Sequence, residues 1–196
     1  MRNVNSCWRL GMCPMLGLSV FLAAAPTLLA EEGVSVLFTF DQPEAQTWRS
    51  VNDNVMGGIS QGTSEITDEG TLLFTGNLSL ENRGGFASLR CPPNQVDLST
   101  VRELVLRVRG DGRTYQCNLH IPTNRIAYSY RAAFTTTADK WQEIRLPLSQ
   151  FGATWFGRPQ ADDPPVDAEK VRSIGFMIAD KKAGPFKLEI DWIKCE

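Results

Sequence analysis

The segment 48–60 combines polar side chains with adjacent glycines between apolar residues. In it, Asn52 and Asp53 could hold a ligand or a cation through their amide and carboxylate oxygens at the edge of a fold. The same composition favours a tight turn, because Asn and Asp bond to their own backbone and Gly57 and Gly58 accept positive φ. We predict a polar binding site here, with a purely structural turn as the alternative.

A second polar cluster, residues 80–90, joins two apolar runs through a pair of glycines. Asn82 or Gly84 can serve the turn of a hairpin. Arg90 would emerge beside the first cluster if the two strands were neighbours, which the sequence alone does not show. The predicted ligand- or partner-binding residues come from both clusters and from one tryptophan in a later loop: Asn52, Asp53, Asn82, Arg83, Arg90 and Trp155.

Catalysis has weak support in the sequence. The single histidine, His120, alternates outward from a strand whose Cys117 and Leu119 face a core, which is typical of a surface side chain. The nucleophile-elbow, zinc-protease and phosphate-loop motifs are missing. Carboxylates from distant strands could still cleave glycosides, although Asp in loops usually bonds to nearby backbone. We predict no catalytic residue, no enzyme activity and no cofactor.

Three cysteines lie beyond residue 30. Cys117 lies in a run where every second residue is apolar, so we predict that it is a small, buried apolar residue. Cys91 and Cys195 could then form a disulfide in an oxidising compartment. No Cys-x-x-Cys spacing occurs after the N-terminal segment, so we predict no metal site. A calcium ion held largely by backbone carbonyls stays open, because such a site leaves little trace in a sequence.

Aromatic residues offer further binding surfaces. The irregular stretch 148–165 displays Trp155, which could serve binding or cover the open end of a core. Tyr128 and Tyr130 share one face of a strand and could line a sugar groove or sit at the core boundary. Trp141 and Trp192 are expected in the core, because apolar residues alternate around them.

Short runs of β-branched and aromatic residues, separated by Gly, Pro, Asn and Asp, recur through residues 34–193. Apolar residues alternate with charged ones in 103–109 and in 186–193, so each strand packs one face on a core. This pattern predicts an all-β single antiparallel β-sandwich or jelly roll. The expected strands are 34–40, 71–74, 76–80, 85–90, 103–109, 115–121, 127–135, 141–147, 173–178 and 186–193, with one helical turn at 167–172.

The N-terminal thirty residues carry two arginines ahead of an apolar run and end at Ala30, before two glutamates. This pattern predicts a secretory signal peptide over 1–30, with an uncleaved anchor as the alternative. Residues 31–196 then form one domain without a membrane span, exported to a bacterial periplasm or outside the cell. They hold 18 basic and 22 acidic residues, a net charge of −4, which argues against nucleic acid as a partner.

The chain also resembles the NADH:ubiquinone oxidoreductase intermediate-associated protein 30 family, named for a complex I assembly factor. The resemblance rests on ordered blocks along the chain: Trp48 with Val51-Asn52-Asp53 and Val55-Met56-Gly57-Gly58, Glu81-Asn82 with Gly84-Gly85-Phe86-Ala87, Gly110-Asp111-Gly112-Arg113 with Tyr115, Trp141 with Leu146-Pro147-Leu148 and Phe151, Ile174-Gly175-Phe176, and Gly184-Pro185-Phe186 with Leu188. It implies a galactose-binding-domain-like fold and a role in assembly.

Together, the residues and the resemblance predict a non-enzymatic binding module that assists the assembly or stability of a protein complex. The alternative is a secreted carbohydrate-binding module, which would read sugar hydroxyls with Asn, Asp and Arg and stack rings on aromatic side chains. We therefore expect a protein or a carbohydrate as the partner, and a monomeric chain.

Overall fold

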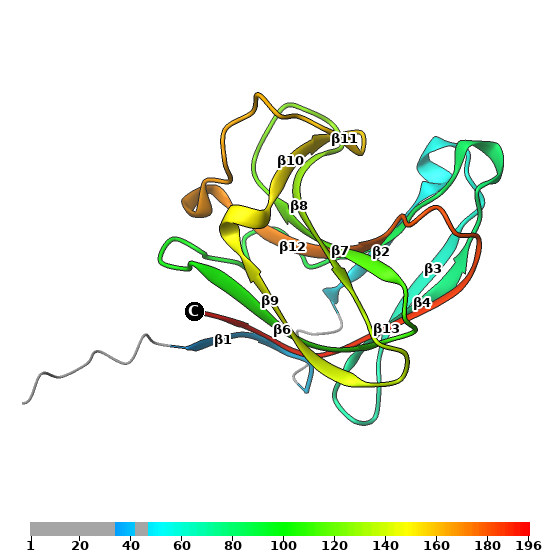
Figure 1. Ribbon diagram of the computed structural model, residues 1–196, viewed down its shortest axis with the longest axis horizontal. Helices are drawn as coiled ribbons and strands as arrows, with labels where there is room; N and C mark the ends of the chain where they lie inside the picture. Colours follow the sequence, from blue (N-terminus) through cyan, green and yellow to red (C-terminus); the bar gives the residue numbers. More distant parts are fainter. Residues whose placement is uncertain (1–33, 42–46) are drawn as a thin grey trace, which may run out of the picture. The chain divides into compact units, whose positions relative to one another are not determined.

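The computed structural model describes residues 34–41 and 47–196, and the predicted signal peptide at 1–30 lies outside them. Two antiparallel sheets form in this part of the chain (Figure 1). A six-stranded sheet has the order β3-β4-β13-β6-β9, and β1 also pairs with β13. Its strands are β1 (Ser35–Thr39), β3 (Gln61–Ile66), β4 (Leu72–Leu78), β6 (Glu103–Gly110), β9 (Trp141–Pro147) and β13 (Gly184–Cys195).

The seven-stranded sheet has the order β11-β10-β8-β7-β12-β5-β2. Its strands are β2 (Arg49–Asn52), β5 (Ala87–Arg90), β7 (Thr114–His120), β8 (Tyr128–Thr135), β10 (Gly152–Trp155), β11 (Arg158–Pro159) and β12 (Ser173–Ile178). Short 3-10 turns lie in the loops between the strands, among them η2 (Asp53–Met56), η3 (Glu81–Arg83), η4 (Leu148–Gln150) and η5 (Ala168–Lys170). No helix in the described ranges is long and apolar enough to cross a membrane.

The core lies between the inner faces of the two sheets, as the alternation of apolar residues predicts. Phe74, Leu188 and Ile190 come from the six-stranded sheet, and Leu119 and Phe176 come from the other. All of them are fully buried. Tyr128 and Tyr130 also face this core, with 9% and 3% of their surface exposed, so of the two alternatives for these tyrosines the position at the core holds and the sugar groove does not.

The strands that sequence reasoning missed are short or polar. Two expected strands, 71–74 and 76–80, are one strand, β4. The strands β2 and β3 were missed because Asn, Ser, Gln and Thr obscure their alternation, and β10 and β11 lie in the stretch predicted to be irregular. All ten expected strand positions nevertheless lie on observed strands, and the all-β fold of two antiparallel sheets is confirmed.

A β-bulge corrects the placement of Trp192. The pairing of β13 with β6 shifts register between Ile190 and Trp192, which turns Trp192 outward and brings Ile193 into the core. Trp141 also lies on the outer face, under the guanidinium groups of Arg107 and Arg109 at 5.5 and 4.8 Å from the ring centre. Both tryptophans are therefore half-buried surface residues beneath cations rather than core residues.

The expected disulfide is also wrong. Cys91, Cys117 and Cys195 are all free and buried. Cys195 ends β13 in one sheet, while Cys91 follows β5 in the other, so the sandwich separates the two sulfurs. Cys117 is fully buried as predicted, and desolvation raises the pKa of its thiol, which keeps it protonated and unreactive.

Candidate binding surfaces

Asp53 is the centre of a buried hydrogen-bond cluster at one end of the sandwich. Only 1% of its surface is exposed. Ser60 donates its backbone N–H at 2.9 Å to Oδ1 and its hydroxyl at 2.6 Å to Oδ2. The backbone N–H groups of Gly85 and Phe86 donate to Oδ2 at 2.7 and 3.3 Å. The carboxylate thus joins the two polar clusters of the sequence, and its oxygens are occupied by the protein itself.

Glycines leave the space that this carboxylate fills. A Cβ at Gly84 would stand 2.6 Å from Asp53 Oδ2, and a Cβ at Gly58 would collide with the same carboxyl group. Burial opposes ionisation of Asp53, but the hydrogen bonds from Ser60, Gly85 and Phe86 outweigh it and lower its pKa. The structure therefore gives Asp53 an architectural role. It does not expose this side chain to a ligand.

The other predicted residues of these clusters lie around the same end of the molecule. Asn52 donates its Nδ2 to the Gly62 carbonyl at 3.0 Å, and its Oδ1 is buried without a partner in the described structure. Asn82 and Arg83 are exposed in η3, where both adopt positive φ. The two side chains are therefore accessible, whereas Asn52 is tied to β3.

Four large apolar side chains are exposed beside Asn82 and Arg83. Val55 and Met56, in η2, are 71% and 55% exposed, and Ile59 and Leu80 are 49% and 46% exposed. The Ser79 backbone N–H donates to the Ser60 hydroxyl oxygen at 3.0 Å and so holds the neighbours of these residues together. We call the surface of Val55, Met56, Ile59, Leu80, Asn82 and Arg83 the rim surface.

Arg90 does not join the rim surface. It lies at the far end of β5, where it takes part in one straight row of residues across the seven-stranded sheet. Strand register places the members of this row side by side on the face that points away from the core: Arg49, Arg90, Gly175, Asn118, Arg131 and Gly152. We call it the arginine row.

The arginine row spans the outer face of the sheet. Hairpin β10–β11 lies at one end of this sheet and the loops of η2 and η3 at the other, and both rise on the side away from the six-stranded sheet (Figure 1). Sequence reasoning missed Arg49, Asn118 and Arg131. Alternation along β7 and β8 points the last two outward, but only the strand pairing aligns them with Arg90.

In the part of the chain that the structure describes, no ion pair neutralises Arg49, Arg90 or Arg131 on this face. Partial desolvation by the surrounding side chains lowers the pKa of Arg90, and desolvation together with the charge of Arg90 lowers the pKa of Arg131. The neighbouring His120 is half-buried, and its pKa falls to about 3 because of burial and because Arg90 and Arg131 repel its proton. His120 is therefore neutral near pH 7, and it is more buried than the surface position predicted for it.

Trp155 lies at the β10–β11 end of the same sheet. It is 45% exposed, its indole Nε1 donates to the Ile126 carbonyl at 3.0 Å, and its ring lies 5.7 Å from that of Phe156, which is 53% exposed. This hydrogen bond fixes the orientation of the ring. The structure thus distributes the six predicted residues over three places: the Asp53 cluster with the rim surface, the arginine row, and this aromatic pair.

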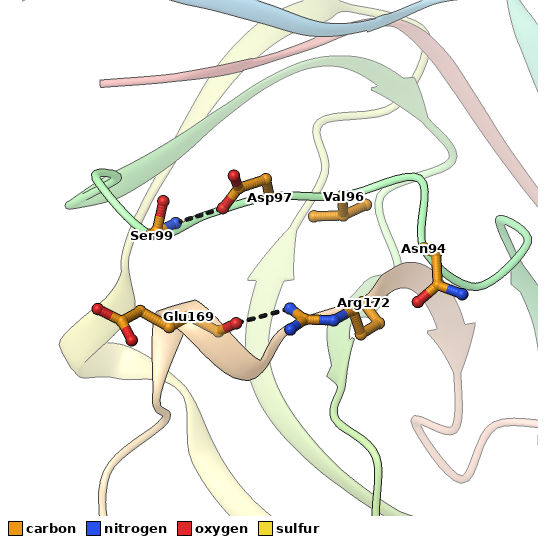
Figure 2. A pocket seen from close by; sticks show the side chains of 6 residues that line it. All are labelled: Asn94, Val96, Asp97, Ser99, Glu169 and Arg172. Carbon is orange, nitrogen blue, oxygen red and sulfur yellow. Dashed lines mark hydrogen bonds between the residues drawn. The ribbon is translucent and has the colours of Figure 1, made fainter.

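A concavity of about 430 Å³ lies elsewhere, between the loop after β5 and η5 (Figure 2). Its polar groups are occupied locally. Arg172 donates to the carbonyls of Glu169 and Val171 at 2.6 and 2.8 Å, and Asp97 accepts from the Ser99 backbone N–H at 3.0 Å. These side chains bond to adjacent backbone, so they do not converge on a common point as groups that hold a ligand do.

The third sequence block is structural as well. Arg113 pairs with Asp180, with side-chain distances of 2.6 and 3.0 Å. Asp111 accepts from the Tyr115 hydroxyl at 3.0 Å and from the Lys187 backbone N–H at 2.8 Å.

In residues 34–41 and 47–196, no three His, Cys, Asp or Glu side chains gather as a group suited to a metal ion.

Comparison with known proteins identifies the family. Residues 38–190 match the family described as Complex I intermediate-associated protein 30. The chain belongs to this family. It is 33% identical over 184 residues to the mitochondrial complex I intermediate-associated protein 30 of Mus musculus, and 32% identical over 197 residues to that of Drosophila melanogaster. The matches cover 83% and 87% of this chain, and 56% and 66% of the two relatives.

These relatives correct one prediction about the family member described here. The named proteins of mouse, fly, nematode and Neurospora crassa are mitochondrial, which overturns the prediction of a bacterial periplasmic or extracellular protein. A basic, apolar N-terminal segment is shared by more than one targeting route, so its composition was not enough to decide the compartment.

Solved structures that resemble this family member share its sandwich. A family 11 carbohydrate-binding module from Clostridium thermocellum, solved with a β-1,3-1,4-mixed-linked tetrasaccharide, aligns with a TM-score of 0.63 at 18% identity, over 83% of this chain and 95% of the module. An agarase aligns with a TM-score of 0.55 at 15% identity, over 84% of this chain and 25% of the agarase. At these identities the likeness shows the fold alone.

Proposed function

We propose that this chain is a non-catalytic binding module that assists the assembly of respiratory complex I, and that the rim surface contacts its protein partner. The membership of the family supports the process, because its named relatives are associated with an intermediate of complex I. The exposure of four large apolar side chains on neighbouring loops supports the surface and is the observation that carries this proposal.

The composition of the rim surface suits a protein interface. Val55, Met56 and Leu80 would supply an apolar centre, and Asn82 and Arg83 a polar edge. Exposed apolar side chains that gather in one place on a monomer often mark such contacts. The Asp53 cluster beneath them fixes the loops, so little conformational entropy is lost when a partner binds.

Three features support the absence of catalysis. His120, with a pKa of about 3, is a poor general base near pH 7. The buried carboxylates Asp53 and Glu189 are occupied by hydrogen bonds, and Glu189 is paired with Arg109 at 2.8 Å. The buried thiol of Cys117 stays protonated. The ionisable groups inside the fold therefore stabilise structure rather than activate a nucleophile.

The test is deletion of the gene in the source organism, followed by native-gel separation of complex I intermediates. Deletion should deplete mature complex I, and the wild-type chain should restore it. Val55→Asp and Met56→Asp, each placing a charge in the apolar centre, should restore less than a tenth of it. Ile126→Asp is the matched control, because Ile126 is 80% exposed at the opposite end of the seven-stranded sheet.

Two outcomes would reject the proposal in different ways. Normal complex I in the deletion strain would remove the assembly role. Full restoration by both rim variants, at wild-type protein levels, would keep the assembly role but remove the rim surface as its contact.

A second candidate function is carbohydrate binding, supported by the exposed rings of Trp155 and Phe156 beside the outer face of the sheet. The tetrasaccharide named for the structural neighbour motivates the choice of probe. If the Trp155 ring stacks on a sugar, the mixed-linked tetrasaccharide should quench tryptophan fluorescence. The Trp155→Ala variant should then bind it about tenfold or more weakly. An unchanged spectrum at millimolar tetrasaccharide would eliminate this candidate.

A further inference from the structure

The arginine row differs from the five arginines of the described chain that form ion pairs. Arg107, Arg109, Arg113, Arg125 and Arg145 each pair with a carboxylate. Within residues 34–41 and 47–196, no carboxylate forms an ion pair with Arg49, Arg90 or Arg131. Three cations thus share one sheet face without a counter-charge from the described residues.

Their arrangement is unfavourable without a ligand. Arg49 and Arg90 stand directly opposite each other on β2 and β5, and like charges in that position repel. Arg131, three strands away from Arg90, lies close enough for Arg90 to lower its pKa. The Arg131 side chain is oriented by hydrogen bonds to the Ser129 hydroxyl at 2.9 Å and to Gln116 at 3.5 Å, both neutral partners. The positive charge is therefore oriented and left uncompensated.

A second, independent observation marks the middle of the row. Asn118 lies between Gly175 and Arg131 and is only 2% exposed, yet its Oδ1 has no hydrogen-bond partner in the described structure. A buried acceptor without a donor is costly, and native structures rarely leave one unless a ligand or water completes it. The arginines are suited to bind an anion here. The Asn118 Oδ1 is suited to accept a hydrogen bond from an O–H or N–H group beside that anion.

No side chain stands on the surface between Arg90 and Asn118, because the residue there is a glycine. Gly175 separates Arg90 from Asn118, and a Cβ there would stand 2.5 Å from the Leu89 carbonyl oxygen. Gly152 ends the row beside Arg131. Neighbouring strands are about 4.8 Å apart, so Arg90 and Asn118 bracket a gap of roughly 10 Å, which accommodates a ring of six atoms.

We propose that the arginine row is a binding site for a hydroxylated anion, the chemistry of a sugar phosphate or a uronic acid. Arg90 and Arg131 hold the phosphate or carboxylate by charge-assisted hydrogen bonds, and Asn118 Oδ1 accepts from a hydroxyl on the same molecule. This site lies on a different face from the rim surface and does not depend on the role proposed there.

The test is a titration of the full chain, followed by amide NMR, with four probes: glucose 6-phosphate, glucuronate, glucose and inorganic phosphate. Glucose 6-phosphate or glucuronate should produce saturable shifts at Asn118, Arg131 and Gly175. Glucose and inorganic phosphate should each bind at least about tenfold more weakly, because one lacks the charge and the other the carbon-bound hydroxyls. Comparison of the two anions decides between phosphate and carboxylate.

Substitutions in the arginine row test whether the anion binds there. Arg90→Gln and the double variant Arg90→Gln/Arg131→Gln should each weaken the better anion about tenfold or more, and Asn118→Leu should abolish the preference over inorganic phosphate. Lys187→Gln removes the same charge from the other sheet and should leave binding unchanged. If the double variant does not fold, the exposed Arg90 alone decides the test.

Three results would overturn the proposal: no saturable shift with either anion, glucose binding as tightly as the anions, or equal affinity in wild type and Arg90→Gln. Inorganic phosphate binding as tightly as glucose 6-phosphate would remove the role of Asn118. Loss of binding in these variants with complex I assembly intact would separate this site from the rim surface.

Discussion

The Asp53 cluster and the arginine row show opposite ways to place charge on one sandwich. At Asp53, one buried anion receives four hydrogen bonds from the loops around it. In the arginine row, three cations have no carboxylate partner and a buried amide oxygen has no hydrogen-bond donor in the described structure. The first region stabilises the fold, and the second holds polar groups that the described residues leave without partners.

The comparison also shows that the segments with the most unusual composition are not the ones that expose polar groups to a ligand. The blocks around Asp53 and Asp111 stood out because glycines and acidic residues cluster there, and both proved to be internal supports. The arginine row has no local motif, since each member comes from a different strand. Unusual composition therefore marked the architecture here, while the candidate ligand groups lay in ordinary alternating strands.

The largest expected effect is at Asp53. The Asp53→Ala variant leaves buried donors from Ser60 and Gly85 without an acceptor, so the free energy of unfolding should fall by about 3–5 kcal/mol. Urea denaturation measures it, and Asp68→Ala, at an exposed aspartate, is the control. Equal stability of the two variants would show that the cluster does not support the fold.

The glycines beside Asp53 should come next. A Cβ at Gly84 stands 2.6 Å from Asp53 Oδ2, so Gly84→Ala should destabilise the chain by about 1–3 kcal/mol through displacement of the carboxylate. Gly152→Ala in the arginine row meets no atom within 4 Å and should change stability by less than about 0.5 kcal/mol. Thermal melts of the two variants make this comparison, and a reversed order would refute it.

Burial of His120, together with the charges of Arg90 and Arg131, should make stability fall with acid. His120 stays neutral in the native chain down to about pH 3, whereas an unfolded histidine gains a proton below pH 6.5. The unfolded state therefore binds more protons in this window, and the free energy of unfolding should decrease by up to about 2 kcal/mol from pH 7 to pH 5.

Replacement of the titrating group checks this origin. His120→Gln should abolish most of the decrease, and Arg90→Gln/Arg131→Gln should reduce it because the pKa of His120 then rises. Urea denaturation at both pH values, with NMR titration of the single histidine, measures the two quantities. A slope that survives in His120→Gln would assign it to other groups.

The smallest expected effect has the opposite sign. Asn118→Leu removes a buried acceptor that lacks a donor, so it should leave stability unchanged or raise it by up to about 1 kcal/mol. Differential scanning calorimetry would show this as a small rise in Tm. A loss of more than about 2 kcal/mol would mean that Asn118 supports the sheet, as Asp53 supports the rim.

The fold was largely predictable because alternation and turn residues are local signals. Apolar residues at every second position fixed most strands, including the core faces of β6 and β7. The prediction failed where strand pairing determines the face on which a side chain lies, as at the bulge that turns Trp192 outward. It also failed at Glu189, one of the charged residues that alternate with apolar ones in 186–193, because this side chain is 3% exposed and paired with Arg109 rather than in water.

By itself, the sequence determined the all-β class, the family resemblance and the closeness of Asp53 to glycine turns, because these depend on residue type and short spacing. Only the tertiary structure decided that Asp53 is buried, that Cys91 and Cys195 lie in different sheets, and that Arg90 aligns with Asn118 and Arg131. The physical reason is that strand register joins residues far apart in the chain, and hydrogen bonds across strands carry no signature in either strand alone.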